Sequence, residues 1–318
     1  MSASDPRSGR STVVIDERWR SPREGQFLLA SAALGRPARV NVLTPPPAVS
    51  AAPLLLLLHG ADDDPDCWES GVGLSARARE LGAVIVMPEG GAVGFCTDWV
   101  HAERPVPGRI GRPGGRRDQV APAWERFHLD EVLPWAEARF SASGHRVVLG
   151  VSMGGLGAIA YTARRPGTFA AAASLSGVLN LFAPGIAALT LSALLRERQH
   201  PYALWGSPRE DRRRWEAHDP VSLASRLDGV PLYLARADGR PVPGDPNFPA
   251  LTGVLERLIG PCTDSFSRRL NALGIRATVH HGHGVHMWPT WNREFDRAWP
   301  FLTAALGLAD ARGGRGGG

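Results

Sequence analysis

Short apolar runs recur along the chain and alternate with longer segments of helical periodicity. Runs such as residues 53–60 and 83–89 are almost continuously apolar, which is typical of strands buried on both faces. The segments 124–140 and 251–273 are amphipathic at a helical spacing. Alternating strands and helices predict an α/β fold with a mostly parallel central sheet flanked by helices. The predicted strands are residues 39–44, 53–60, 83–89, 145–151, 170–177, 231–238 and 276–282.

A single domain accounts for most of the chain, because 318 residues with 43% apolar content suffice for one large core. We expect this domain to span residues 11–310. The polar residues 1–10 and the Gly/Arg tail 311–318 are predicted to be disordered. Two insertions interrupt the alternation. One is a Pro/Gly/Arg-rich loop at 101–121, and the other is residues 180–220, which we interpret as a helical cap over one end of the sheet.

The basic charge of the chain comes from arginine alone, since the sequence has a net charge of +5 and contains no lysine. No zinc-finger, RNA-recognition or helix-turn-helix pattern accompanies this charge, so nucleic acid is not an expected partner. The lack of lysine also excludes a Walker-type nucleotide site and a pyridoxal phosphate Schiff base. We therefore expect no cofactor.

Cysteine usage and the N-terminal sequence bear on the compartment. The three cysteines show no disulfide or metal spacing, which suits a reducing environment. The longest apolar run, residues 53–58, is far shorter than a membrane span. The first twenty residues lack the apolar core of a secretory signal, so we expect a cytoplasmic protein.

The sequence GVSMG at residues 150–154 sets Ser152 between a β-type run and a helical one. This is the Gly-x-Ser-x-Gly pattern of the nucleophile elbow. The glycines matter because a side chain beside so sharp a strand-to-helix turn would collide with its neighbours. The dipole of the following helix favours negative charge developing near the hydroxyl. The pattern predicts that Ser152 is a nucleophile, and a glycine-rich packing turn is the alternative.

A serine nucleophile needs a histidine base, which in this architecture comes last along the chain. Four histidines follow the cap, and we choose His286 because it lies in the loop between the last strand and a helix that begins near Pro289. A metal site built from these histidines is the alternative. It is disfavoured because no Asp, Glu or Cys lies in that stretch. The other three histidines are His280, His281 and His283.

The remaining parts of such a site are an acid and two oxyanion donors. Spacing favours Asp238, directly after the strand at 231–238, over Glu256 as the acid. The expected oxyanion donors are the amides of Met153, which follows the nucleophile, and Ala61, which follows the 53–60 strand. His59, beside Ala61, fits a buried structural role better than that of a second base.

Several segments match a known family in the right order. They are LGRPARVNV, VIVMPEGGAVGFCTDW, WERFHLDEVLPW, GVSMGG, LSGVLN, the ALWG and HDP segments of the cap, and HMWPTW. From about Gly35 to Leu308 the chain resembles the putative-esterase (esterase D-like) family of α/β-hydrolases, and within it the antigen 85 mycolyltransferases of actinobacteria. The resemblance implies the α/β-hydrolase fold and a Ser-Glu-His triad formed by Ser152, Glu256 and His286. It thus favours Glu256 over Asp238, which becomes a candidate for the acceptor pocket.

The chain also departs from the antigen 85 pattern. In that group an Asp and an Arg in the loop after the second core strand help to hold trehalose, and His59 and Asp62 replace them here. We therefore expect ester chemistry with a different alcohol site, in which His59, Asp62, Asp238 and Trp288 contact substrate. The tryptophans Trp205, Trp215, Trp288 and Trp291 would either line an apolar cleft or belong to the core.

Three functions fit these residues. The first is a carboxylic ester hydrolase that acts on a small-molecule ester or thioester through an acyl-serine. The second is an acyltransferase that moves the acyl group to a sugar or natural-product hydroxyl. The third is a non-catalytic binding protein on the same scaffold. The arginine-rich loop 101–121 is a candidate dock for a carrier-bound acyl donor, and a solvated loop is the alternative.

Overall fold

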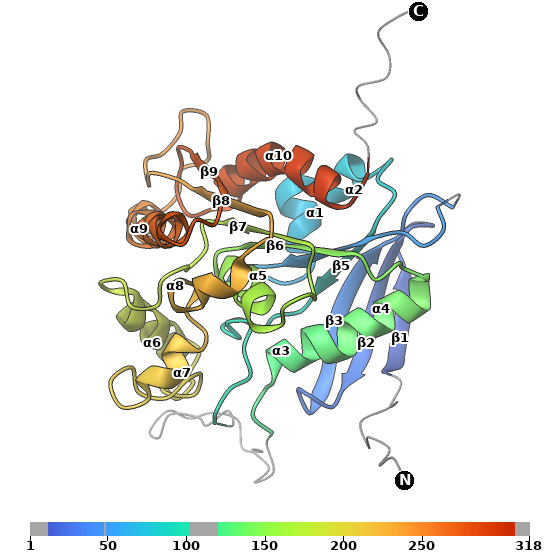
Figure 1. The fold of residues 1–318 in the computed structure, drawn as a ribbon. Helices are drawn as coiled ribbons and strands as arrows, with labels where there is room; N and C mark the ends of the chain where they lie inside the picture. Colours follow the sequence, from blue (N-terminus) through green and yellow to red (C-terminus); the bar gives the residue numbers. More distant parts are fainter. Residues whose placement is uncertain (1–11, 48, 102–119, 309–318) are drawn as a thin grey trace, which may run out of the picture.

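The computed structural model describes residues 12–47, 49–101 and 120–308, and its core is one twisted sheet (Figure 1). The strand order is β1-β2-β3-β5-β4-β6-β7-β8-β9. The strands are β1 (Val13–Trp19), β2 (Glu24–Ser31), β3 (Arg36–Leu43), β4 (Leu54–Leu58), β5 (Val84–Pro88), β6 (Arg146–Val151), β7 (Ala171–Leu175), β8 (Leu232–Arg236) and β9 (Thr278–His281).

The strands from β5 to β9 in this order are all parallel, and the sheet begins with an antiparallel part formed by β1, β2 and β3. The seven predicted strands overlap β3 to β9, so the predicted α/β fold with a mostly parallel sheet is confirmed. Sequence analysis missed β1 and β2. In β1 even the apolar Val13 and Ile15 are 61% and 52% exposed, so the strand has no buried face to give a pattern. It forms because it pairs with β2.

Helices cover both faces of the sheet (Figure 1). In β4, Leu54, Leu56 and Leu58 belong to one core and Leu55 and Leu57 to the other, because successive side chains of a strand point to opposite faces. The second core includes α1 (Cys67–Val72), α2 (Leu74–Arg77) and α10 (Trp288–Ala305). The first includes α3 (Trp124–Arg126), a π-helical segment (Phe127–Val132), α4 (Leu133–Phe140), α5 (Met153–Arg164) and α9 (Ala250–Ala272).

The predicted cap at residues 180–220 lies between β7 and β8 and contains α6 (Ile186–Arg196) and α7 (Arg212–Glu216). Trp205 and Trp215 are each 1% exposed and pack edge to face with ring centres 5.0 Å apart. They therefore belong to the core of the cap and do not line a cleft. The chain returns to β8 through α8 (Pro220–Leu223) and a 3-10 turn (Ala224–Leu227).

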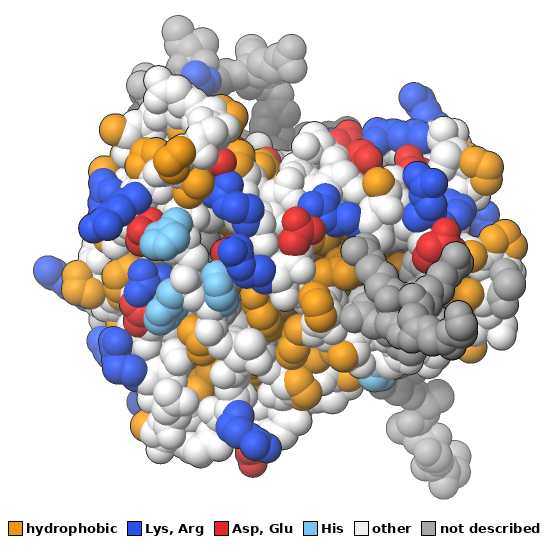
Figure 2. Space-filling model, turned by 90° about the horizontal axis from the view of Figure 1, so that it is seen from above, with side chains coloured by type: hydrophobic (Ala, Val, Ile, Leu, Met, Phe, Trp, Pro, Cys, Tyr) orange, Lys and Arg blue, Asp and Glu red, His pale blue; other side chains and the backbone are white. Residues whose placement is uncertain are grey.

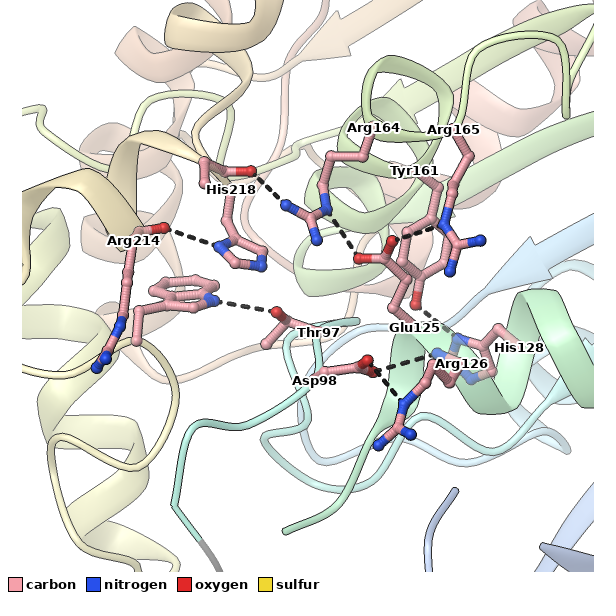
Figure 3. Close-up of polar contacts among 12 residues, drawn as sticks. Thr97, Asp98, Glu125, Arg126, His128, Tyr161, Arg164, Arg165, Arg214 and His218 are labelled. Atoms are coloured by element: carbon pink, nitrogen blue, oxygen red, sulfur yellow. Dashed lines mark hydrogen bonds and ion pairs between the residues drawn. The ribbon is translucent and has the colours of Figure 1, made fainter. Parts of the chain in front are cut away.

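A polar network joins the cap to the body of the molecule (Figure 3). Arg164 at the end of α5 donates from Nη1 to the carbonyl of Ala217 at 2.7 Å and from Nε to Glu125 at 2.8 Å. The ring of His218 stacks on Trp205, with ring centres 5.4 Å apart. Burial lowers the pKa of His218 to about 4, so this ring is neutral at pH 7. The cap is thus held by buried, specific contacts.

Some predictions concern parts of the chain that the structure does not cover. The ends at 1–10 and 311–318, the domain limits at 11 and 310, and nearly all of the loop 101–121 lie outside the described residues. Within the described ranges, no helix is long and apolar enough to cross a membrane. The cytoplasmic location stays a prediction.

Candidate active site

Ser152 lies in the sharp turn between β6 and α5, with φ 53° and ψ −116°. A non-glycine residue in such a conformation costs about 1–3 kcal/mol and persists only where its surroundings enforce it. The flanking glycines explain how they do so. A Cβ on Gly150 would lie 2.0 Å from the Gly154 carbonyl oxygen, and one on Gly154 would lie 2.0 Å from that of Leu58. The two strands and the helix approach too closely for any side chain at these positions.

Ser152, His286 and Glu256 form a continuous chain of hydrogen bonds. The Ser152 hydroxyl donates to His286 Nε2 at 2.8 Å, and His286 Nδ1 donates to Glu256 Oε2 at 2.6 Å. The three side chains come from the end of β6, the loop before α10, and α9, and they are 8%, 5% and 0% exposed. Because the carboxylate fixes the proton on Nδ1, Nε2 is left to accept the hydroxyl proton.

The buried carboxylate of Glu256 is fully provided with donors. Its Oε1 accepts from the Ser176 hydroxyl at 2.9 Å and from the Ala237 amide at 2.8 Å, while Oε2 accepts from His286. Hydrogen bonds of this kind offset the free-energy cost of removing a carboxylate from water. Sequence analysis did not identify Ser176 or Ala237. Both directly follow parallel strands, β7 and β8, and the carboxyl ends of neighbouring parallel strands meet at one edge of the sheet. The position of Ser176 and Ala237 at the ends of two predicted strands was therefore a signal that the sequence contained.

The loop that carries His286 is held from two sides. The His286 amide donates to the Thr252 carbonyl at 3.1 Å, and its ring packs edge to face on Trp291, with ring centres 5.0 Å apart. Thr252 lies in α9 one turn before Glu256, so one helix positions both the acid and the backbone beside the histidine.

Asp238 has other partners than His286. Its Oδ2 accepts from His283 Nδ1 at 2.8 Å, and its Oδ1 accepts from the Arg240 amide at 3.0 Å. A cavity of about 490 Å³ lies next to the His286 loop, lined mainly by residues 241–250 together with Val285. The hydrogen bonds of Asp238 thus do not support it as the acid that orients His286, and its place in an acceptor pocket stays a prediction.

The loop after β4 lies against Ser152. A Cβ on Gly60 would be 3.4 Å from the Ser152 Cβ, so the two backbones are close. Among the residues that the structure describes, the amides of Ala61 and Met153 have no hydrogen-bond acceptor. Both predicted oxyanion donors are therefore available beside Ser152.

Of the side chains expected to contact substrate in this loop, His59 is buried inside the protein. It is 2% exposed, its Nδ1 donates to the Gly60 carbonyl at 2.7 Å, and its Nε2 accepts from the Gly90 amide at 2.8 Å. Burial lowers its pKa, so the ring is neutral. The structure corrects the expected substrate contact of His59, because both ring nitrogens are occupied by backbone groups. The structural role proposed for it fits.

The other two expected substrate contacts lie nearer the surface. Asp62 is exposed, has φ 65° and pairs with Arg196 of the cap helix α6 at 2.5 Å. Trp288 is half-buried, and its Nε1 donates to Asp63 Oδ1 at 3.3 Å. Burial, followed by the nearby charges of Asp64 and Asp62, raises the pKa of Asp63 to about 6. A carboxylate that sequence analysis did not identify thus lies beside the predicted site.

The histidine-rich segment is divided among separate pairs. In the described part of the chain, no three His, Cys, Asp or Glu side chains are arranged to hold a metal ion. Histidine, arginine and acidic side chains are intermixed on the face that α10 covers (Figure 2). Each of the four histidines has its own carboxylate: His280 pairs with Glu294, His281 with Asp264, His283 with Asp238, and His286 with Glu256.

Comparison with known proteins identifies relatives of two named activities. The chain is 29% identical over 286 residues to Esterase Rv1288 of Mycobacterium tuberculosis, which covers 86% of this chain and 58% of that protein's length. It is 27% identical over 290 residues to the diacylglycerol acyltransferase/mycolyltransferase Ag85B of Mycolicibacterium smegmatis, covering 88% and 85% of the two chains.

Solved structures share the fold. Mycobacterium tuberculosis MPT51 has a TM-score of 0.70 at 20% identity, covering 90% of this chain and all of that one. An S-formylglutathione hydrolase from Agrobacterium tumefaciens has a TM-score of 0.64 at 18% identity, covering 92% and 99%. The family model described as "Putative esterase" matches residues 31–302. The chain therefore belongs to this esterase family of α/β-hydrolases, as its sequence motifs predicted.

Proposed function

We propose that this chain is a serine-dependent carboxylic ester hydrolase with Ser152 as nucleophile, His286 as base and Glu256 as the acid that orients it. The observation that carries the proposal is the hydrogen-bonded chain from Ser152 through His286 to the buried Glu256, with Ser152 held in a strained elbow. Relatives named as an esterase and as acyltransferases support an enzyme of this chemistry.

In the first half of the reaction the Ser152 oxygen attacks the ester carbonyl carbon while His286 Nε2 takes the hydroxyl proton. The carbonyl oxygen becomes an oxyanion, and the amides of Ala61 and Met153 stabilise it. The carbon–oxygen bond to the alcohol then breaks, and His286 gives its proton to the departing oxygen. The products of this half-reaction are an acyl-serine and a free alcohol.

In the second half, His286 removes a proton from water, whose oxygen attacks the acyl-serine carbonyl. The bond to Ser152 breaks, and the proton returns to the serine oxygen. Glu256 holds the imidazole tautomer and stabilises the imidazolium that forms.

Apolar side chains on α9, the helix that carries Glu256, favour a substrate with an apolar acyl group. Leu251, Val254, Leu255 and Leu258 recur at helical spacing on α9, and Leu251 and Val254 are 72% and 49% exposed. The stripe extends towards the cap, since a Cβ on Gly185 would lie 2.9 Å from Leu258 Cδ1. An exposed apolar stripe on the helix that carries Glu256 favours an apolar ligand.

The second candidate function is acyl transfer to an alcohol other than water. The similarity to Ag85B, which extends over most of both chains, favours it. The same three residues serve both reactions, because an alcohol that replaces water in the second half gives a new ester. Exclusion of water from the acyl-serine then decides between the two outcomes.

The test is intact-protein mass spectrometry of the wild type and Ser152→Ala after mixing with p-nitrophenyl esters of different chain length. We expect p-nitrophenol release and a transient acyl adduct on the wild type alone. Absence of an adduct and of turnover with every ester would favour a non-catalytic binding protein. Added sugar alcohols separate hydrolysis from transfer, since a transferase forms acylated sugar in excess over free acid.

A further inference from the structure

The acidic segment 62–66 directly follows Ala61 in the loop after β4. One of its carboxylates lacks the arginine partner that the others have. Asp62 pairs with Arg196 at 2.5 Å, Asp64 with Arg39 at 2.8 Å, and Asp66 with Arg20 at 2.9 Å. Asp63 has no arginine partner within the ranges that the structure describes. Its one side-chain donor there is the Trp288 indole, which binds Oδ1.

Asp63 is also the acid that lies beside the reacting groups. The position of a Cβ on Gly60 is 3.4 Å from both Asp63 Oδ2 and Ser152 Cβ, so Oδ2 and the nucleophile both lie close to the same glycine. Trp288, which holds Oδ1, is two residues after His286. The carboxylate is half-buried between the oxyanion loop and the start of α10.

The reaction geometry decides which part of an ester reaches this carboxylate. His286 must protonate the departing alcohol oxygen, so the group beyond that oxygen lies on the His286 side of the site. Trp288, which follows His286 by two residues, binds Asp63 Oδ1, and His286 is among the groups whose charge acts on Asp63, so Asp63 lies near the His286 loop. Asp63 therefore faces the alcohol portion of the substrate.

We propose that Asp63 is a specificity determinant that pairs with a cationic ammonium group on the alcohol portion of the ester. The inference rests on the proposed function. A neutral hydroxyl would supply one hydrogen bond, whereas a cation also balances the charge of a carboxylate that is partly removed from water and lies between two other acids. The adjacent indole of Trp288 adds a side chain that attracts cations.

The experiment compares two esters of equal size that differ only in charge, choline butyrate and 3,3-dimethylbutyl butyrate. The quantity measured is the ratio of their kcat/KM values. We expect the wild type to favour the choline ester by about tenfold or more, as for a charge-assisted contact. Asp63→Asn should bring the ratio close to one. The matched control is Asp64→Asn, which removes the neighbouring, arginine-paired carboxylate and should keep the wild-type ratio.

The pH dependence of this ratio in the wild type requires no variant to fold. The groups that act on Asp63 are Asp62 and Asp64 in its own loop, Trp288 as donor, and His286 from the loop before α10. Burial raises the pKa of Asp63 to about 6, so the carboxylate ionises between pH 5 and pH 7. The preference for the choline ester should therefore increase over that interval. A pH effect that is common to both esters cancels in the ratio.

Two results would overturn the inference while leaving the proposed function intact. One is equal hydrolysis of both esters by the wild type at all pH values. The other is a preference for 2,3-dihydroxypropyl butyrate over both esters that is lost in Asp63→Asn, since Asp63 would then select hydroxyl groups. Failure of the proposed function looks different, because no ester would be turned over and Ser152 would not be acylated.

Discussion

At the scale of single residues, the proposed acid Glu256 can be tested through the hydrogen bonds that its carboxylate accepts. Glu256→Gln should lower kcat about 10²- to 10⁴-fold, as expected when the imidazole loses its orienting carboxylate. Two oxygens of Glu256 accept three donors, and an amide can offer only one oxygen. Its NH₂ group must then face a donor, so the variant should also unfold at a lower temperature. Steady-state kinetics and thermal denaturation measure both effects.

Asp238→Asn is the matched control for this prediction. It removes a carboxylate that is bonded to His283 at the surface and has no contact with His286. We expect kcat within about a factor of three of the wild type, as for surface changes of less than ~0.5 kcal/mol. A large loss of kcat in Asp238→Asn together with a small one in Glu256→Gln would reverse the assignment of the acid.

At the scale of elements, the turn between β6 and α5 and the loop after β4 make different demands on their glycines. Gly154→Ala should prevent stable folding, because its Cβ would lie 2.0 Å from a backbone oxygen of β4 that has no room to move. Gly60→Ala places its Cβ at 3.4 Å from its nearest neighbours, an ordinary contact, so the fold should survive. Circular dichroism melts of both variants test this contrast. An Ala at position 154 with a wild-type melting temperature would contradict the close packing of this turn.

Strands with continuous apolar runs could be predicted from the sequence, whereas the largely exposed β1 could not. The strands β4 and β5 were evident because both of their faces are buried. β1 was not, because its stability comes from pairing with β2. The motif at Ser152 and the position of His286 followed from local pattern and chain order. Spacing along the chain favoured Asp238, because a side chain that reaches inward from α9 leaves no signal at the strand ends. The family resemblance favoured Glu256, which is the acid hydrogen-bonded to His286.

At the scale of the whole molecule, the sheet brings together groups far apart in the sequence. Ser152 and His286 are 134 positions apart, yet they share a hydrogen bond at the edge where the parallel strands end. The residues that support them, Ser176 and Ala237, also follow strands at that edge. Binding and catalysis at the carboxyl ends of parallel strands are a general property of such sheets. The segment 180–220, which the sequence predicts to be a cap, is attached to the rest of the molecule through contacts that involve none of these four residues.

Folding buries two histidines, His128 and His218, and lowers their pKa values. The stability of the whole molecule should therefore depend on pH. Burial lowers the pKa of His128 and of His218 to about 4, below the usual value near 6.5. The unfolded chain therefore binds more protons than the folded one as the pH falls below 6.5, and stability is lost. At pH 5, keeping each of these histidines neutral lowers the free energy of unfolding by about 2 kcal/mol. Asp63 acts in the opposite sense, because a raised pKa favours folding at low pH, by about 1 kcal/mol between pH 7 and 5.

The two histidines outweigh the aspartate, so the free energy of unfolding should fall by about 2–3 kcal/mol between pH 7 and pH 5. Urea denaturation at the two pH values measures this difference. In His128→Gln the fall should be smaller by about 2 kcal/mol, because the side chain that must stay neutral is gone. In His145→Gln, which replaces an exposed histidine, the fall should match that of the wild type. A pH dependence that is the same in all three proteins would mean that groups other than the ring of His128, which bonds to Tyr161 and Glu89, control acid stability.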